Sequence, residues 1–212
     1  MIKLLYCSIE KLPDSQIGNH LRLLPEFIRE DITRCRHLSD RKSRLLGKLM
    51  LLDALKSEGV HYLLHELQHD FYRKPFLENW KPFNISHAGE MVVFCYGKHA
   101  VGVDLEKLDR LDDPGILRYF HPEEQEYIIA SKSTDLAFYE IWVKKEALLK
   151  AIGIGITKGL DQFSCVQDKI RYAGTDWHLH KIDLQQQYLC YLCHQAPSIE
   201  VVTAEFDSFP EN

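Results

Sequence analysis

The 212-residue sequence contains no apolar run near the roughly 18 consecutive residues that a membrane-spanning helix needs, which excludes such a helix. It also lacks an excess of positive charge. The 26 Lys and Arg residues against 31 Asp and Glu give a formal net charge of −5, which argues against a general nucleic-acid binder. The opening stretch, MIKLLYCSIEKL, lacks the small-residue cleavage site of a secretory signal and predicts a first strand. Without an export signal, we expect a cytoplasmic protein with six reduced cysteines.

A second C-x-x-C pair is also missing, so the single pair in CYLCH, residues 190–194, supports a zinc site only weakly. The same five residues match the pattern of covalent haem attachment. However, QYLCYLCHQ also has the pattern of a strand, in which Cys190 and Cys193 point to opposite faces and make a poor clamp. We favour the strand, and an absorbance spectrum would test the haem alternative.

The composition, 45% apolar and 27% charged, is typical of a globular protein with one large domain or two small ones. Because the predicted strands come in consecutive groups, the fold class is α+β. Helices are expected at 18–30, from Ser39 or Asp40 to Gly59, near Pro114 and Pro122, and from Ser133 or Thr134 to Gly153. Strands are expected at 2–9, 65–76, 83–86, 91–96, 100–106, 161–167, 169–174, 177–184, 187–195 and 199–206.

Positive charge is concentrated in one segment, although the chain as a whole is acidic. Between residues 34 and 48 a single acid, Asp40, stands against Arg34, Arg36, Arg41, Lys42, Arg44 and Lys48. Such a segment could attract a small polyanion. On this observation alone, the ordinary interpretation is a solvated helix face.

The stretch VGVDLEKLDR, residues 101–110, starts as a buried strand but places Asp104 and Glu106 on one face. Residues two apart in a strand lie roughly 6.5–7 Å from each other, so both carboxylates can converge on one ion. Two carboxylates 4 Å apart repel by about 4 kcal/mol, and a sheet end would not keep them together without a cation or full hydration. Both a cation site and a frayed, hydrated strand end fit this pattern.

The stretch STDLAFYEIWVKKEALLKAIG, residues 133–153, predicts an amphipathic helix. Its buried stripe consists of Phe138, Ile141, Trp142, Leu148, Leu149 and Ile152. Glu146 and Lys150, four residues apart, lie together at the edge of this stripe. They form either a surface pair worth about 0.3–0.5 kcal/mol or a pair that can be reached from a cleft. Lys145 falls within the stripe, and we interpret it as snorkelling along the apolar face.

In FNISHAG, residues 83–89, Asn84 and Ser86 alternate with apolar residues and His87 precedes a turn. The polar side chains either bond their own backbone or aim a hydroxyl and an imidazole at a phosphate.

Taken in order, these segments resemble the surfactin-synthetase type of 4′-phosphopantetheinyl transferase. The family has a G-[IV]-D-x-E strand, followed about forty residues later by W-x-x-K-E-[AS]-x-x-K on a helix. The matching residues here are Gly102, Val103, Asp104, Glu106, Trp142, Lys145, Glu146, Ala147 and Lys150. The upstream N-[IL]-S-H is Asn84 to His87, and a K-P dipeptide is Lys74 and Pro75. Arg73 stands where a glycine usually precedes K-P, and the basic segment is spaced differently from that of relatives.

The resemblance implies Mg²⁺-dependent transfer of the phosphopantetheine arm of coenzyme A to a serine of an apo acyl or peptidyl carrier protein, with release of 3′,5′-ADP. It implies that Asp104, Glu106 and Glu146 hold the metal, with Glu124 as a further acid nearby. The implied catalytic residues are Glu146 as base, Lys150 on the leaving phosphate, and Asp104. The residues that it assigns to coenzyme A are Arg34, Arg36, Arg44, Lys74, Ser86, His87 and Lys150.

The resemblance also implies two similar halves, each a small, mostly antiparallel sheet packed on a long helix. We expect the halves at 1–99 and 100–212, with the active-site cleft between them, and a monomer that binds neither nucleic acid nor membrane. Because carrier proteins are acidic, the basic segment or the stretch after Lys107 is expected to receive the carrier. The alternatives are a metal-dependent hydrolase of nucleotide pyrophosphates and a non-catalytic module that binds coenzyme A or a carrier.

Overall fold

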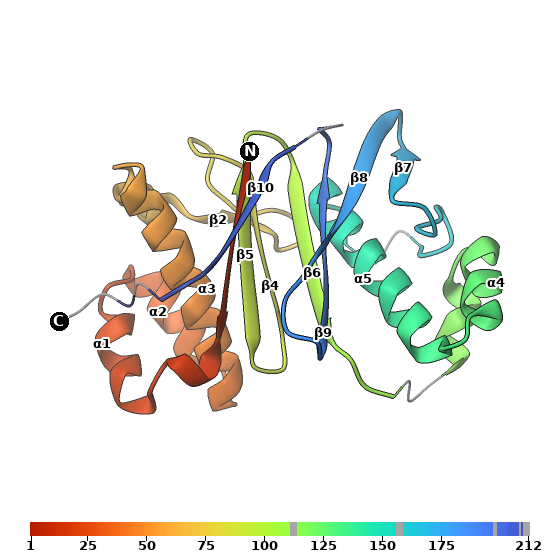
Figure 1. Ribbon diagram of the computed structural model, residues 1–212. Helices are drawn as coiled ribbons and strands as arrows, with labels where there is room; N and C mark the ends of the chain where they lie inside the picture. Colours follow the sequence, from red (N-terminus) through yellow and green to blue (C-terminus); the bar gives the residue numbers. More distant parts are fainter. Residues whose placement is uncertain (111–113, 156–158, 197–198, 208, 210–212) are drawn as a thin grey trace. The chain divides into compact units, whose positions relative to one another are not determined.

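The computed structural model describes residues 1–110, 114–155, 159–196, 199–207 and 209. Two compact units make up the chain: Met1–Lys98 together with Glu200–Asn212, and His99–Ile199. Each unit contains a four-stranded sheet with helices packed against it (Figure 1), so the predicted α+β class is confirmed. In the part of the chain that is described, no helix has both the length and the apolar character needed to span a bilayer.

The sheet of the first unit has the order β10-β1-β5-β4. Its strands are β1 (Ile2–Ser8), β4 (Phe83–Ala88), β5 (Met91–Gly97) and β10 (Val201–Glu205). β10 runs parallel to β1, with Ile2 opposite Val201, and the other neighbours are antiparallel. The strand pairing therefore places the segment from Glu200 in the first unit, and in this respect the division differs from the expected range of 100–212.

Among its described residues this unit also has three α-helices and three 3₁₀ helices, and α3 packs against β4 and β5 (Figure 1). They are η1 (Ile9–Lys11), η2 (Asp14–Gln16), α1 (Ile17–Leu21), α2 (Glu26–Thr33), α3 (Leu38–Ser57) and η3 (His61–Glu66). The single helix expected at 18–30 is two helices, because Pro25 has an extended backbone (ψ 150°) and begins α2. α3 begins at Leu38, just before the expected caps, and ends ahead of Gly59, where the Val60 N–H donates to the Leu55 carbonyl over 2.9 Å.

The strand expected at 65–76 is wrong. η3 occupies its start, and only a two-stranded hairpin follows, β2 (Gln68–His69) with β3 (Pro75–Phe76). The reason lies in Asp70, whose Oδ1 accepts the Lys74 backbone N–H over 2.8 Å. This side-chain bond closes a turn in the middle of the predicted strand.

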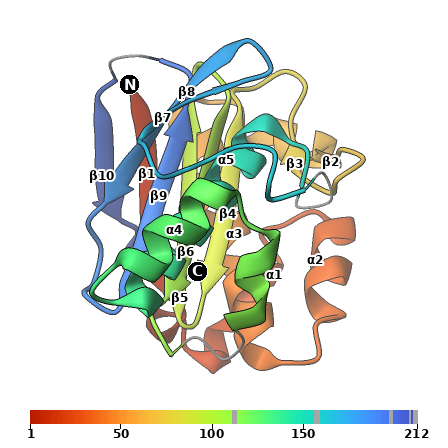
Figure 2. The same cartoon turned by 90° about the vertical axis from the view of Figure 1, so that its right-hand side faces the viewer.

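The sheet of the second unit has the order β6-β9-β8-β7 and is antiparallel throughout. Its strands are β6 (Val101–Lys107), β7 (Lys169–Tyr172), β8 (Thr175–Ile182) and β9 (Tyr188–His194). η4 (Pro114–Tyr119) and α4 (Pro122–Ala130) precede α5 (Thr134–Ile152). α5 packs against β6, β8 and β9, and α4 packs on α5 (Figure 2).

The boundaries of α5 match those expected from the sequence. The Ser133 hydroxyl accepts the Leu136 N–H, and Gly153 adopts a left-handed conformation (φ 81°) at the C-terminal cap. The expected strand at 161–167, however, is irregular. Its backbone bonds to side chains instead of to a neighbouring strand, since the Phe163 carbonyl accepts from Lys145 and the Cys165 N–H donates to Glu124.

The thiols of CYLCH are core residues of β9. Cys190 and Cys193 are both 0% exposed, and β9 is paired on both sides, with β6 and β8. A buried central strand offers no room for haem, so the strand interpretation is confirmed. None of the six cysteines, all of which are described, forms a disulfide.

Candidate functional site

The two carboxylates of β6 point toward α5. Gly102, two residues before Asp104, lies so close to the helix that a Cβ there would be 2.2 Å from the Ala147 carbonyl oxygen. Because side chains two apart share a face of a strand, Asp104 and Glu106 face α5 as well. Gly102 therefore allows the backbone of α5 to approach β6 closely. Asp104 and Glu106 come next on the same face of the strand, within reach of side chains on α5.

Three side chains on α5 meet this face of β6. Trp142, Glu146 and Lys150 are spaced four residues apart, so they form a stripe along the helix, and all three are half-buried. Trp142 Nε1 donates to Glu106 Oε1 over 3.1 Å, and Lys150 Nζ donates to Asp104 Oδ1 over 2.5 Å. We call Asp104, Glu106, Trp142, Glu146 and Lys150 together the acid ladder. Glu146 lies between the two cross-contacts.

Glu146 is the acid of the acid ladder whose carboxylate charge is balanced least by neighbouring groups. Its pKa is raised to about 7, chiefly because burial disfavours the carboxylate. Lys150 lowers this pKa, whereas the charges of Asp104 and Glu106 raise it. Oε1 of Glu146 is buried and has no hydrogen-bond partner among the described residues. A carboxyl group with this pKa can hold or release a proton near neutral pH.

Glu106 shows the same effect in weaker form. Burial and the Asp104 charge raise its pKa, while Trp142 and Lys150 lower it. The three acids therefore influence one another electrostatically, and a nearby cation would stabilise all three.

The donor set of the acid ladder suits a hard cation, because carboxylate oxygens are the ligands that Mg²⁺ prefers. Glu146 Oε1, which has no hydrogen-bond partner, and the raised pKa of the Glu146 side chain fit the same interpretation. Within the described residues, however, no three His, Cys, Asp or Glu side chains form a closed group that could hold a metal ion. Here the Lys150 ammonium supplies the positive charge beside Asp104. The metal site thus stays a prediction.

Glu124 has a different role from the one suggested by the sequence. It is 0% exposed, and its Oε2 lies 2.9 Å from Nζ of Lys145, which is equally buried. Its oxygens also accept the His121 and Cys165 backbone N–H groups over 3.0 and 2.7 Å. Both oxygens are therefore used in the core, which corrects the expectation of a further acid beside the metal. Lys145 is buried and paired, and does not snorkel.

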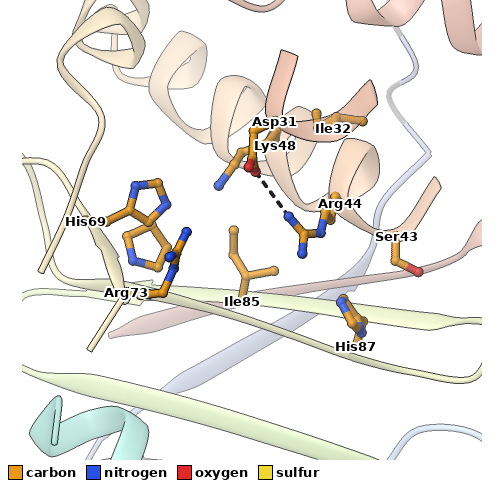
Figure 3. Close-up of a pocket in the computed structure, with 10 residues that line it drawn as sticks. Asp31, Ile32, Ser43, Arg44, Lys48, His69, Arg73, Ile85 and His87 are labelled. Atoms are coloured by element: carbon orange, nitrogen blue, oxygen red, sulfur yellow. Dashed lines mark hydrogen bonds and ion pairs between the residues drawn. The ribbon is translucent and has the colours of Figure 1, made fainter. Parts of the chain in front are cut away.

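A second candidate site is a pocket of about 360 Å³ in the first unit. Its lining comes from α2, α3, the β2–β3 hairpin and β4 (Figure 3): Asp31, Ile32, Ser43, Arg44, Lys48, His69, Arg73, Pro75, Ile85 and His87. Arg44 Nη1 donates to Asp31 Oδ2 over 3.1 Å. The basic side chains of Arg44, Lys48 and Arg73 line the pocket with a single carboxylate, that of Asp31, so the pocket suits an anion.

Comparison with known proteins decides the family. A model described as the 4′-phosphopantetheinyl transferase superfamily matches residues 100–196. A 4′-phosphopantetheinyl transferase of Aneurinibacillus migulanus is 30% identical over 172 residues, which cover 77% of this chain and 70% of the relative. One from Bacillus subtilis is 30% identical over 165 residues, 69% of each chain, and one from Bacillus pumilus is 25% identical over 185 residues, 77% and 74% of the two chains. The chain belongs to the 4′-phosphopantetheinyl transferase superfamily.

The superfamily match covers almost the whole second unit of this phosphopantetheinyl transferase and every residue of its acid ladder. The resemblance seen in the sequence is therefore confirmed. The structure brings Asp104, Glu106, Glu146 and Lys150 together, as the motif predicted.

Of the residues predicted to bind coenzyme A in this phosphopantetheinyl transferase, only some line the pocket of the first unit. Arg44 and His87 line the pocket. Ser86 is buried and lies on the face of β4 opposite to His87. Four further residues do not line the pocket. Arg34 is exposed and paired with Glu30, Arg36 is exposed, and Lys74 is half-buried in the turn between β2 and β3. Lys150 belongs to the acid ladder of the second unit.

The residues assigned to coenzyme A from the sequence leave out five polar residues of this pocket: Asp31, Ser43, Lys48, His69 and Arg73. Of these, Lys48 was noted only as part of the basic segment that could attract a polyanion. Lys48 was predictable in part, since it lies four residues after Arg44 on α3 and shares its helix face. Nothing in the local sequence signals that His69 lies beside α3, because the hairpin reaches the helix only through the tertiary fold.

Proposed function

We propose that this protein transfers the 4′-phosphopantetheine arm of coenzyme A to a serine of an apo acyl or peptidyl carrier protein. The serine oxygen forms a bond to the phosphorus that carries the pantetheine arm, and the bond from that phosphorus to the bridging oxygen breaks. The serine loses its proton, and 3′,5′-ADP leaves with the bridging oxygen. Membership of the superfamily supports this reaction.

Glu146 is the group that takes the serine proton in this proposal. In the metal-free protein the pKa of Glu146 is raised to about 7, near the pH at which a general base works best. Its unsatisfied Oε1 is available to accept a hydrogen bond from a hydroxyl or a water molecule.

In this proposal Lys150 neutralises charge on the departing phosphate. Its ammonium donates to Asp104, and its side chain is 30% exposed, so it can shift between Asp104 and a bound phosphate. Asp104 therefore positions Lys150 when no donor is bound.

Asp104, Glu106 and Glu146 would hold a Mg²⁺ ion. When bound, this ion would neutralise charge on the diphosphate as it builds up during transfer. The mutual repulsion among the buried Asp104 and the half-buried Glu106 and Glu146, which a cation would reduce, supports this part of the proposal.

The cationic pocket of the first unit is proposed to hold the nucleotide part of coenzyme A, with Arg44 and His87 among its contacts.

As predicted from the sequence, we further propose that the protein is a monomer, is located in the cytoplasm and acts on an acidic carrier protein. Six reduced thiols are in keeping with that location.

The observation that carries the proposal is the position of Glu146 between the Glu106–Trp142 and Asp104–Lys150 contacts. To test it, the protein is mixed with coenzyme A, Mg²⁺ and a purified apo carrier, and the carrier is weighed by mass spectrometry. We expect a gain of one phosphopantetheine mass, and 3′,5′-ADP in equal amount. Omission of Mg²⁺ with added EDTA should abolish the gain.

Two outcomes would replace the proposal. Consumption of coenzyme A without modification of any carrier would indicate a pyrophosphate hydrolase. Binding of coenzyme A without any reaction, for several carriers, would indicate a non-catalytic module.

A further inference from the structure

One residue of the CYLCH motif takes no part in the acid ladder or in the pocket of the first unit. His194 ends β9 and is 5% exposed, and its Nδ1 is buried without a hydrogen-bond partner among the described residues. Buried polar atoms in proteins are almost always hydrogen-bonded, because burial without a partner costs free energy. The packing of β9 alone therefore gives no reason for a histidine at this position.

The His194 ring is neutral near pH 7. Its pKa is lowered to about 4, chiefly because burial disfavours the imidazolium, and a hydrogen bond with the Ala196 backbone offsets this only in part. A bond that raises the pKa of an imidazole is one in which the ring donates, so Ala196 accepts the single N–H of the neutral ring. Nδ1 of His194 therefore carries a lone pair for which the described residues offer no donor.

A second imidazole lies beside this nitrogen. His178 on β8 is directly opposite His194 in the antiparallel pairing, and the two ring centroids are 5.7 Å apart with an interplanar angle of 19°. The neighbouring pair, Leu179 and Cys193, belongs to the core that contains α5. Because successive residues of a strand point to opposite faces, the two histidines lie on the face of the sheet that is turned away from α5.

The charged groups beside this imidazole pair are already paired with one another. Lys169 on β7 lies opposite His178, and its ammonium is 3.1 Å from Asp176 Oδ2. Arg171 Nη1 is 3.2 Å from Asp176 Oδ1, so this one acid is paired with two cations. The charge of His178 lowers the pKa of His194, and the pair therefore resists protonation. What remains is a neutral pair of nitrogen ligands.

We propose that His178 and His194 bind a Zn²⁺ ion on this face of the second sheet, through Nδ1 of His194 and a ring nitrogen of His178. Neutral imidazole is a preferred ligand of Zn²⁺. Zinc-binding histidines typically donate their other ring N–H to a carboxylate or a backbone carbonyl, which is the arrangement of His194 with Ala196. This inference does not depend on the proposed transferase activity.

The spacing of the rings fits a shared ion. With Zn–N bonds of about 2.0–2.1 Å and tetrahedral angles, two imidazoles on one zinc have their centroids about 5 Å apart, and a small rotation of the half-buried His178 closes the difference from 5.7 Å. Water completes the coordination. Two protein ligands make an open site, in keeping with the absence of any group of three or more His, Cys, Asp or Glu side chains from the described residues.

The site differs in chemistry from the acid ladder. The acid ladder offers carboxylate oxygens on the face of the sheet toward α5, whereas the histidine pair offers nitrogens on the other face. Mg²⁺ prefers oxygen ligands and Zn²⁺ accepts imidazole, so an excess of Mg²⁺ should occupy the first site and leave the second one open.

The test is calorimetric titration with Zn²⁺ of the full chain without a histidine tag, in buffer with excess Mg²⁺. We expect one Zn²⁺ per chain in wild type. His178→Ala should weaken this binding at least about tenfold, because the loss of a ligand costs no less than the loss of a second-shell partner. His65→Ala, which removes an exposed histidine from the first unit, is the matched control and should leave the affinity unchanged.

Two further readouts distinguish a metal ligand from a structural residue. At a hundredfold excess of Zn²⁺ over its Kd, the Tm of wild type should rise by about 5 °C or more, because the ion binds only the folded state, and the rise should be absent in His178→Ala. In ¹H–¹⁵N spectra of the imidazoles, Zn²⁺ should shift the Nδ1 signal of His194 in wild type and leave it in place in His178→Ala.

Three results would overturn the inference: no Zn²⁺ bound in the presence of Mg²⁺, equal affinity in wild type and His178→Ala, or an unshifted His194 signal in zinc-loaded wild type. The carrier assay is a separate test. A protein that modifies a carrier but binds no Zn²⁺ would refute only the histidine site, and one that binds Zn²⁺ at these histidines without modifying any carrier would refute only the transferase.

Discussion

Lys145 and Glu124 form an ion pair from which solvent is excluded, with Nζ 2.9 Å from Oε2 and both side chains 0% exposed. The Lys145 ammonium also donates to the Leu160 and Phe163 carbonyls over 2.6 and 2.7 Å. An ammonium has three protons, and each has an acceptor here. Through this network α5 fixes both α4 and the irregular segment that follows the helix.

Lys145→Met should destabilise the protein by about 3–5 kcal/mol, because Glu124 would remain buried without its counter-charge. Urea unfolding followed by circular dichroism measures this loss. The double variant Lys145→Met with Glu124→Leu should recover part of it, since no unpaired charge is left. Lys132→Met, at an exposed position, is the control. A loss below about 1 kcal/mol in Lys145→Met would show that the pair is not needed.

Gly102→Ala should separate β6 from α5. The new Cβ would lie 2.2 Å from the Ala147 carbonyl oxygen and 2.3 Å from the Ala151 nitrogen, and backbone atoms cannot move aside cheaply. We expect a loss of about 1–3 kcal/mol in unfolding free energy together with loss of transfer activity, because the acid ladder spans this contact.

Gly18→Ala is the matched control for this variant. A Cβ on Gly18 meets nothing within 4 Å, and the residue lies in α1, so the change should be neutral or slightly stabilising. Full activity and stability in Gly102→Ala would contradict the close packing of helix and strand.

Glu146→Gln should change how stability depends on pH in metal-free protein. The pKa of Glu146 rises from 4.5 to about 7 on folding, so the folded state binds more protons than the unfolded state between these values. Wild type therefore loses stability as the pH rises through this window. Above pH 7 the glutamine variant, which has no charge to bury, should be more stable than wild type by about 1–2 kcal/mol, after discounting for partial exposure.

The measurement is urea unfolding in EDTA at pH 4.5 and pH 8. The advantage of the glutamine variant should largely disappear at the lower pH, where the carboxyl group is protonated in the folded state and about half protonated in the unfolded state. Glu126→Gln, an exposed position on α4, should show no such difference. An equal advantage at both pH values would mean that the pKa of Glu146 is ordinary.

Asp104→Asn should reduce transfer to the carrier at least about 100-fold while the fold survives. The change keeps the size of the side chain but removes the charge that holds Lys150 and takes part in the acid ladder. Initial rates of carrier modification, read by mass spectrometry, measure the effect, and thermal unfolding verifies the fold. If the activity is unchanged, Asp104 does not belong to the site.

The local elements around the acid ladder could be predicted from the sequence. The alternation in β6 showed that Asp104 and Glu106 share a face, and the spacing of four put Glu146 beside Lys150 on α5. Ser133 and Gly153 marked the helix ends, because capping depends on neighbours along the chain. Periodicity did not reveal the two buried cross-contacts, and only the resemblance to the family linked strand and helix.

What the sequence by itself determined is the pattern within each element: which residues share a face, where α5 ends, and which family motif the chain carries. The tertiary structure decided which faces meet. In the folded protein Lys145 pairs with the buried Glu124, and the C-terminal strand β10 pairs with β1. The hairpin that carries His69 and Arg73 lies beside α3. The physical reason is that periodicity and capping act over a few residues, whereas ion pairing and sheet pairing join residues that are distant in the chain and depend on the packed core.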